Sequence, residues 1–232
     1  MILKSFGCSF IFGTDLPDDG SGSDSAKFSH LTWPSLLAKQ LNYDYDCFAR
    51  PGIGNLRILE SILTQCTKPQ PAVFVIGWTW IDRFDYTIPA SGRINYRDLV
   101  SADVWKTVMP VDSTATSEHY YRDLHSQLRD KLTTLTYIKT AIDALQQKNI
   151  PFVMTYMDDL IFETQWHTTS SIEYLQDSIR PHMIQFDQVN FLEWAKKNGF
   201  PISETHHPLE QAHSEAVKVL YKQNTVDRLR LA

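Results

Sequence analysis

A hydroxyl near the N-terminus occupies a position suited to covalent chemistry. An apolar run from Met1 to Phe6 is followed by Gly7, and Ser9 lies in the small-residue turn after it. If the apolar run is a strand, this turn lies at the carboxyl edge of a sheet, where ligands bind in open α/β proteins. Ser9 is therefore a candidate nucleophile with an accessible hydroxyl. It requires a base within reach and hydrogen-bond donors for an oxyanion.

Alternating strand and helix patterns predict the sheet that would position this turn. The most strand-like run is Ala72–Ile76, which is bounded by Pro71 and Gly77. An apolar run without alternation is typical of a strand buried on both faces of a parallel sheet. The sequence thus predicts a three-layer α/β/α fold of flavodoxin-like type, with a central parallel sheet formed by residues 1–6, 43–48, 72–76 and 151–156.

Helical patterns fill most of the intervening segments. The most regular pattern covers residues 117–148, and its predicted apolar face consists of Leu124, Leu128, Leu132, Leu135, Ile138, Ile142 and Leu145. Helices are also predicted after Thr32 and after Asn55, and over residues 172–179, 191–197 and 209–228. Residues 85–116 follow no period, which predicts an insertion or lid within a single domain spanning residues 1–232.

Composition narrows the classes of function. With 43% hydrophobic and 21% charged residues the chain can form a packed core, and its net charge of −5 argues against a nucleic-acid partner. Three cysteines without a C-x-x-C pair predict reduced thiols. No secretory signal and no membrane-spanning run is apparent. We therefore expect a cytoplasmic protein that does not bind a membrane, and we leave its oligomeric state open.

Four short blocks carry a resemblance to a known family. They are Gly7-Cys8-Ser9-Phe10, Gly52-Ile53-Gly54-Asn55, Gly77-Trp78-Thr79-Trp80 and Glu204-Thr205-His206-His207-Pro208. Three of them follow predicted strands and the fourth precedes the last helix, so all four can meet at one edge of a doubly wound sheet. In these blocks, their order and their spacing, the chain resembles the SGNH (GDSL-type) hydrolase superfamily. The first and third blocks look more like divergent members found among tailed phages.

The resemblance implies a serine hydrolase without cofactor. Ser9 would be the nucleophile, His207 the general base, and Glu204 the carboxylate that holds the imidazole tautomer. Backbone N–H groups at Ser9 and at Gly54 or Asn55 would line the oxyanion site.

The chain departs from the family pattern in two of these roles. The third block of the family is Gly-x-Asn-Asp, and Thr79 occupies the position of its oxyanion asparagine. Either the Thr79 hydroxyl or the side-chain amide of Asn55 would then serve as donor. Glu204 replaces the usual Asp and adds one methylene. His213 matches a second histidine of the family that is usually structural.

Other assignments fit the residues less well. His206, His207, His213 and Glu204 lack the spacing of a standard ligand set, so no metal is expected. Trp78 and Trp80 would wall the pocket or the core, and stacking on sugars is compatible with that position. A flavodoxin-like nucleotide binder is disfavoured because the first turn lacks a Gly-rich phosphate loop.

Two hypotheses of function result. The first is a serine esterase or acyl hydrolase that cleaves a small carboxylic ester, for which a carbohydrate O-acetyl ester is one candidate. Its partner would be a small-molecule or glycan ester. The second is a catalytically silent protein of the same fold, phage-encoded and associated with the virion, which has a structural or host-interaction role.

Overall fold

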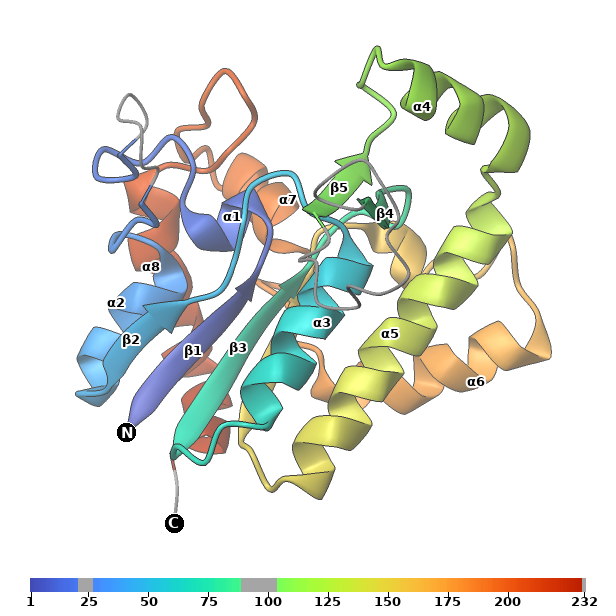
Figure 1. Cartoon of the computed structure of the whole chain (residues 1–232). Helices are drawn as coiled ribbons and strands as arrows, with labels where there is room; N and C mark the ends of the chain where they lie inside the picture. The colour runs from blue at the N-terminus through green and yellow to red at the C-terminus, as the bar shows by residue number, and fades with distance from the viewer. Residues whose placement is uncertain (21–26, 89–103, 231–232) are drawn as a thin grey trace, which may run out of the picture.

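A four-stranded parallel sheet forms the centre of the molecule (Figure 1). The computed structural model describes residues 1–20, 27–88 and 104–230. The strand order is β2-β1-β3-β6, and each neighbouring pair is parallel. The bounds are Ile2–Gly7 for β1, Asp44–Cys47 for β2, Ala72–Trp78 for β3 and Phe152–Tyr156 for β6. The four predicted strands are therefore confirmed, with β3 two residues longer than expected.

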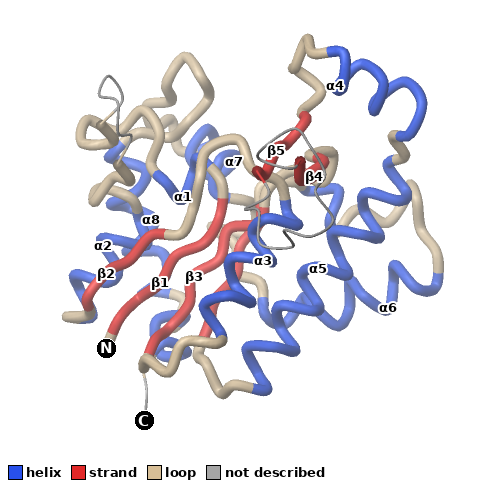
Figure 2. Tube along the Cα trace, in the orientation of Figure 1, coloured by secondary structure: helices blue, strands red, loops and turns tan. Residues whose placement is uncertain are grey.

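Helices cover both faces of this sheet, as Figure 2 shows. Successive side chains of a strand point to opposite faces. One face of the sheet accordingly presents Leu3, Val75 and Val153, which pack in one core with residues of α2, α7 and α8. The other face presents Ile76 and Met154, which pack in a second core with residues of α3, α5 and α6. The helices are α2 (Trp33–Leu41), α3 (Asn55–Cys66), α5 (Gln127–Gln147), α6 (Ser170–Ile179), α7 (Phe191–Lys197) and α8 (Glu210–Lys222). The predicted three-layer α/β/α fold is confirmed.

The long helix predicted over residues 117–148 is interrupted. A short helix α4 (Ala115–His119) continues as a π-helical segment η1 (Tyr120–Leu124), and α5 begins only after Ser126, whose hydroxyl accepts a hydrogen bond from the N–H of Arg129. A 21-residue helix is about 31 Å long, whereas a five- to seven-residue strand spans roughly 17–23 Å. The first turns of α5 extend past the sheet, and there the buried side consists of Asp130, Lys131 and Thr134, whereas the predicted core residues Leu124, Leu128 and Leu132 are exposed.

The last predicted helix also ends early. It stops at Lys222, Asn224 takes a left-handed conformation, and a 3₁₀ segment η4 (Thr225–Leu229) follows. Two further 3₁₀ segments are η2 (Asp159–Ile161) and η3 (Arg180–His182). Within the described residues, no helix has both the length and the apolar character required to cross a bilayer.

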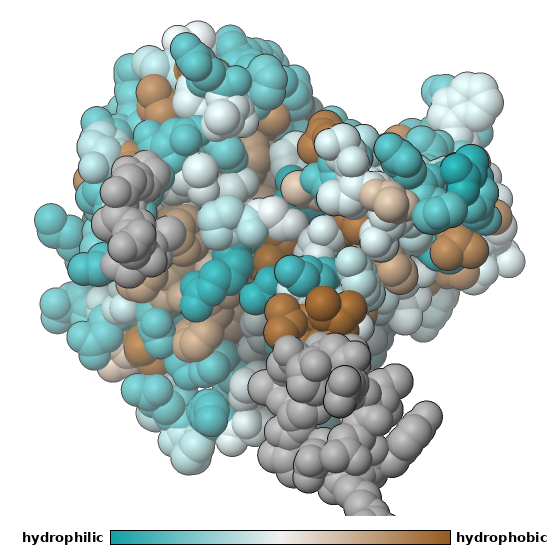
Figure 3. Space-filling view, turned by 45° about the horizontal axis from the view of Figure 1, so that its top comes forward, coloured by the Kyte–Doolittle hydropathy of each residue, from teal (hydrophilic) through white to brown (hydrophobic). Residues whose placement is uncertain are grey.

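The segment predicted to be an insertion contains a β-hairpin. Strands β4 (Phe84–Ile88) and β5 (Val104–Val108) pair in antiparallel fashion beside the carboxyl ends of the parallel strands (Figure 1). The part of the predicted lid at residues 89–103 lies outside the described residues, as does the 21–26 part of the first loop. Figure 3 looks toward this end of the molecule, where the hydrophobic surface outside the grey atoms forms separate patches among hydrophilic residues.

Candidate active site

Close backbone packing fixes the position of Ser9 at the end of β1. Ser9 begins a four-residue helix, α1 (Ser9–Phe12), whose Ile11 side chain packs on the ends of β1 and β3. A Cβ at Gly7 would lie 2.6 Å from Ile11 Cγ1, and one at Gly77 would lie 2.7 Å from the same atom. Both glycines are therefore required for α1 to approach the sheet this closely. Ser9 itself is only 7% exposed, so its hydroxyl is less accessible than the sequence suggested.

His207 lies on a small closed loop that precedes α8. The N–H of Ser203 donates to the carbonyl of His207 at 2.9 Å, and the N–H of His207 donates to the Ser203 hydroxyl at 3.0 Å. His206, at the corner of this loop, has a left-handed conformation. The ring of Phe10 packs against the imidazole of His207, with ring centres 4.9 Å apart. The loop and this ring together hold the imidazole in place.

The first and last blocks of the chain meet at the same sheet edge. Ser9 Oγ lies 2.8 Å from His207 Nε2, and His207 Nδ1 lies 2.8 Å from Asp15 Oδ2. A carboxylate oxygen accepts hydrogen bonds, so Nδ1 carries the imidazole hydrogen and Nε2 presents its lone pair. The Ser9 hydroxyl therefore donates to Nε2, which is the arrangement that a serine nucleophile and its base require.

The carboxylate beside His207 belongs to Asp15 and not to the predicted Glu204. Glu204 is exposed, and its loop closes through Ser203 and His207, which leaves Glu204 at a corner of the turn. Asp15 reaches the imidazole because the chain reverses sharply after α1: Gly13 and Asp15 have φ angles of 87° and 70°. A Cβ at Gly13 would lie 2.5 Å from Ser29 Cβ, so only glycine fits that position.

Two hydroxyl groups of the His207 loop also bind the Asp15 carboxylate. Ser203 Oγ donates to Asp15 Oδ2 at 2.7 Å, and Thr205 Oγ1 donates to the same oxygen. Burial raises the pKa of Asp15, but the hydrogen bonds from Thr205, Ser203 and His207 outweigh it and hold the pKa below its usual value. Asp15 is therefore ionised at neutral pH. The same contacts fasten the N-terminal loop to the C-terminal one.

The predicted oxyanion donor Gly54 faces another partner. Its N–H donates to Asp85 Oδ1 at 2.8 Å, and the N–H of Arg57 donates to Asp85 Oδ2 at 2.9 Å. Asp85 is buried in β4 and also accepts a hydrogen bond from Thr107 on β5 at 2.6 Å. The carboxylate thus binds the N-terminal turn of α3, where the helix dipole favours a negative charge. Because the Gly54 N–H donates to Asp85, it does not serve as a donor to an oxyanion beside Ser9.

The two alternative side-chain donors do not face Ser9. The side chain of Asn55 is hydrogen-bonded to the backbone of Thr79 and Trp80, and the side chain of Thr79 is buried. Asn55 Oδ1 accepts from the N–H of Thr79 at 2.9 Å, and Asn55 Nδ2 donates to the carbonyls of Thr79 and Trp80 at 3.1 and 3.3 Å. Thr79 is fully buried. Within the described residues its hydroxyl has no hydrogen-bond partner. These two residues lock the second turn to the third and do not line the cleft that contains Ser9.

A cleft of about 690 Å³ opens above Ser9 and His207. The second turn reaches it through Gly52, and the segment after β5 reaches it through Met109, Pro110 and Val111. Trp80 and Leu192 form another part of its wall. Ser9 therefore lies in a largely apolar cleft between the segment after the hairpin and α7.

His213 has the structural position that the sequence suggested. It is buried in α8, and its Nδ1 accepts a hydrogen bond from the N–H of Trp33 at 3.1 Å. Burial lowers its pKa to about 3, so the ring is neutral at physiological pH.

Comparisons with known proteins identify likenesses of fold. No family model matches the chain, and no curated protein does. Among solved structures, the psychrotrophic esterase EstA from Pseudoalteromonas is 11% identical with a TM-score of 0.51, and 97% of this chain and 96% of that one are covered. A lipolytic protein of the G-D-S-L family from Veillonella parvula is 12% identical with a TM-score of 0.50, covering 97% and 98%.

An enzyme named for a glycan substrate shares the same architecture. The acetyl xylan esterase Est2A from Butyrivibrio proteoclasticus is 15% identical with a TM-score of 0.50; the match covers 99% of this chain and 64% of that one. At such identities the likeness concerns the fold.

Proposed function

Because the chain has the fold of the SGNH (GDSL-type) hydrolases, we propose that it is a serine esterase that cleaves small carboxylic esters. The observation that carries this proposal is the continuous line of contacts from Ser9 through His207 to Asp15. These residue types in this order are those of an acyl-transfer site.

The contacts assign a role to each side chain. His207 Nε2 takes the proton of Ser9 as its oxygen attacks the carbonyl carbon of the ester. The imidazolium then gives this proton to the departing alcohol oxygen, which leaves an acyl group on Ser9. Water, deprotonated by the same nitrogen, attacks the acyl carbon; the bond from this carbon to Ser9 Oγ breaks, Nε2 returns the proton to Oγ, and the acid is released. Asp15 keeps the proton on Nδ1 and stabilises the imidazolium that forms twice in this cycle.

The tetrahedral intermediate requires donors for its negative oxygen. Gly54, Asn55 and Thr79 are engaged elsewhere or buried. We therefore assign this role to the backbone N–H groups of Ser9 at the first turn and Gly52 at the second, since both residues line the cleft and Pro51, which also lines it, has no N–H. Backbone donors need no reorganisation during the reaction, and each such donor contributes roughly 10²–10³-fold in rate.

The experiment compares wild type with Ser9→Ala on p-nitrophenyl esters of short acids. We expect Ser9-dependent turnover, and we expect His207→Ala to lose activity to a similar extent because the two residues act as a unit. A fluorophosphonate probe should label Ser9, as located by peptide mass spectrometry. Equal turnover by wild type and Ser9→Ala would remove Ser9 from the mechanism.

The second candidate is a silent protein of the same fold with a structural or host-interaction role. One observation favours it: the Gly54 N–H and the Asn55 side-chain amide are bound to other groups and Thr79 is buried, which leaves the Ser9 N–H alone among the predicted oxyanion donors. A silent site retains a Ser9 that the fluorophosphonate probe does not label. Rapid labelling at Ser9 would contradict this candidate.

A further inference from the structure

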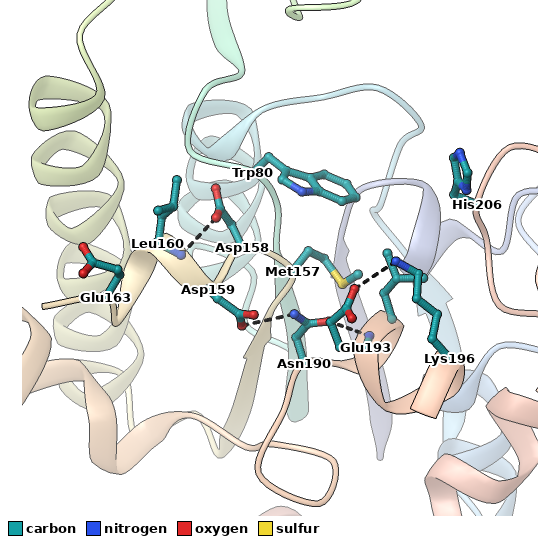
Figure 4. Close-up of a pocket in the computed structure, with 11 residues that line it drawn as sticks. Trp80, Met157, Asp158, Asp159, Leu160, Glu163, Asn190, Glu193, Lys196 and His206 are labelled. Atoms are coloured by element: carbon teal, nitrogen blue, oxygen red, sulfur yellow. Dashed lines mark hydrogen bonds and ion pairs between the residues drawn. The ribbon is translucent and has the colours of Figure 1, made fainter. Parts of the chain in front are cut away.

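A second cavity adjoins the cleft that contains Ser9. Its volume is about 570 Å³, and it shares Trp80, Leu192 and His206 with that cleft. Its far wall includes Asp159 from the segment after β6 and Glu193 from α7. We refer to this space as the Trp80 cavity. In Figure 4 the indole of Trp80 lies between Asp158 and His206, and Asp159, Asn190, Glu193 and Lys196 lie below it.

The direction of the reaction decides which half of an ester enters this cavity. In the proposed function, on which this inference rests, the imidazole of His207 protonates the departing alcohol oxygen. The alcohol half must therefore lie on the side of His207. His206, the neighbour of this base, lines the Trp80 cavity, whereas Met109 and Gly52 line the Ser9 cleft and not that cavity. The alcohol half is directed toward the Trp80 cavity and the acyl half toward the hairpin.

The polar groups of the cavity suit a ligand with many hydroxyl groups. Asp159 Oδ1 accepts from Asn190 Nδ2 at 3.1 Å, and Glu193 Oε1 binds Lys196 Nζ at 2.9 Å (Figure 4). Among the described residues, the second oxygen of Asp159 and of Glu193 has no protein partner. Carboxylate oxygens accept from O–H donors strongly, and the ammonium of Lys196 has further hydrogens to donate.

Trp80 supplies a rigid apolar wall to the same space. The guanidinium of Arg83 lies over its ring at 4.8 Å, and the ring of Phe10 packs against it at 5.6 Å. Arg83 also donates to the carbonyl of Ile53 at 3.1 Å, so its own position is fixed. A fixed aromatic ring beside hydrogen-bonding groups suits a sugar, which has apolar C–H faces and polar edges.

The charges that line the cavity narrow the class of ligand that it can bind. Asp158, Asp159, Glu163 and Glu193 line the cavity together with Lys196, and a second lysine, Lys131, lies 3.7 Å from Glu163, so four carboxylates face two ammonium groups. This excess of negative charge repels phosphate and carboxylate groups. It therefore disfavours phospholipid headgroups and acidic sugars.

We propose that the Trp80 cavity binds the alcohol half of the substrate and that this half is an uncharged carbohydrate, so that the protein acts on an O-acylated neutral glycan.

Binding can be tested without turnover. The Ser9→Ala variant is titrated calorimetrically with the neutral trisaccharide xylotriose and with the anionic trisaccharide of galacturonic acid. We expect xylotriose to bind at least tenfold more tightly, since charged contacts of this kind discriminate by roughly tenfold or more. Equal binding of the two sugars, or no binding of xylotriose, would overturn the proposal.

The chain offers a matched control for the cavity side chains. Glu193 pairs with Lys196 on α7 as Glu215 pairs with Lys218 on α8, three residues apart in each case. Glu193→Ala should weaken xylotriose binding by about tenfold, whereas Glu215→Ala should leave it unchanged. Identical effects of the two substitutions would exclude the cavity as the binding site.

Measuring kcat/KM on two esters distinguishes failure of this inference from failure of the proposed esterase function. In the wild-type background, Glu193→Ala should lower kcat/KM for an acetylated methyl xyloside relative to kcat/KM for p-nitrophenyl acetate by about tenfold. An unchanged ratio would contradict the inference, while Ser9-dependent turnover of p-nitrophenyl acetate would leave the esterase proposal standing. Loss of the esterase proposal would instead appear as an absence of Ser9-dependent turnover on either ester.

Discussion

Asp15 and His207 are 192 positions apart in the chain, and Asp15 Oδ2 lies 2.8 Å from His207 Nδ1. This contact predicts that Asp15→Asn lowers kcat/KM by about 10²–10⁴-fold, because an amide in this place no longer fixes the tautomer or stabilises the imidazolium. The measurement is steady-state hydrolysis of a p-nitrophenyl ester.

Glu204 provides the comparison for this prediction. It carries the same charge, lies three residues from His207 and is exposed. Glu204→Gln should change kcat/KM by less than about twofold. A larger loss in Glu204→Gln than in Asp15→Asn would reverse the assignment of the carboxylate.

The glycine at the end of β3 controls the position of the nucleophile. A Cβ at Gly77 would lie 2.7 Å from Ile11 Cγ1, so Gly77→Ala must displace α1 and with it Ser9. Overpacking of this kind costs about 1–3 kcal/mol, and a displaced nucleophile should lose roughly 10²-fold in kcat. Urea unfolding and ester hydrolysis measure the two effects.

A second substitution distinguishes crowding from other causes. Removing the obstructing side chain in the double variant Gly77→Ala with Ile11→Ala should cost less than the sum of the two single changes. Gly199 is a useful comparison, because a Cβ there meets no atom within 4 Å and φ is 69°. Gly199→Ala should cost about 1 kcal/mol for its backbone and leave kcat unchanged. Additive effects of Gly77→Ala and Ile11→Ala would contradict the steric explanation.

Asp85 connects the β-hairpin to the second turn. It accepts hydrogen bonds from Gly54, Arg57 and Thr107, so Asp85→Asn should lower the free energy of unfolding by about 3 kcal/mol. Thr107→Val removes one of the three donors and should cost about 1 kcal/mol. KM should rise in Asp85→Asn because Met109, at the end of this hairpin, lines the cleft. If the two variants unfold at the same urea concentration, the carboxylate has no role in holding the turn.

His213 makes stability depend on pH. Its folded-state pKa of about 3 is below the ordinary histidine value of 6.5, so the unfolded chain binds the extra proton between these values. Stability therefore falls as pH decreases below 6.5, and this loss continues toward pH 3. From pH 6.5 to pH 5 the contribution is about 2 kcal/mol, since each unit corresponds to 1.36 kcal/mol.

Urea unfolding at pH 7.5 and pH 5 tests this dependence. His213→Gln lacks the titrating ring, so its stability should fall by about 2 kcal/mol less than that of wild type over this interval. Parallel losses in wild type and His213→Gln would show that another group causes the effect.

The sequence predicted the sheet well because its strands are buried on both faces. Runs such as Ala72–Ile76 show no helical period and are bounded by Pro71 and Gly77, so strand type and order follow directly. The break before α5 was missed because the leucine period continues through it. Leu124, Leu128 and Leu132 fit the period but are exposed, because the buried side of the first turns of α5 consists of Asp130, Lys131 and Thr134.

The site was predicted only in part. The contact between Ser9 and His207 follows from the first and last blocks and their place at the sheet edge. Asp15 was overlooked because the nearer Glu204 satisfied the expected spacing. The signal that could have identified Asp15 is Gly13-Thr14-Asp15, an acidic residue two positions after the glycine that ends α1. The partners of Gly54 depend on Asp85 from the hairpin, a contact that no local pattern specifies.

The shared origin of Ser9 and Asp15 also determines when activity can arise during synthesis. Both groups belong to one short segment, whereas residue 207 is translated after every strand of the parallel sheet. A nascent chain that ends at residue 200 holds the Ser9 hydroxyl and the Asp15 carboxylate but has no imidazole between them. The proposed catalysis would therefore begin only after residue 207 has left the ribosome.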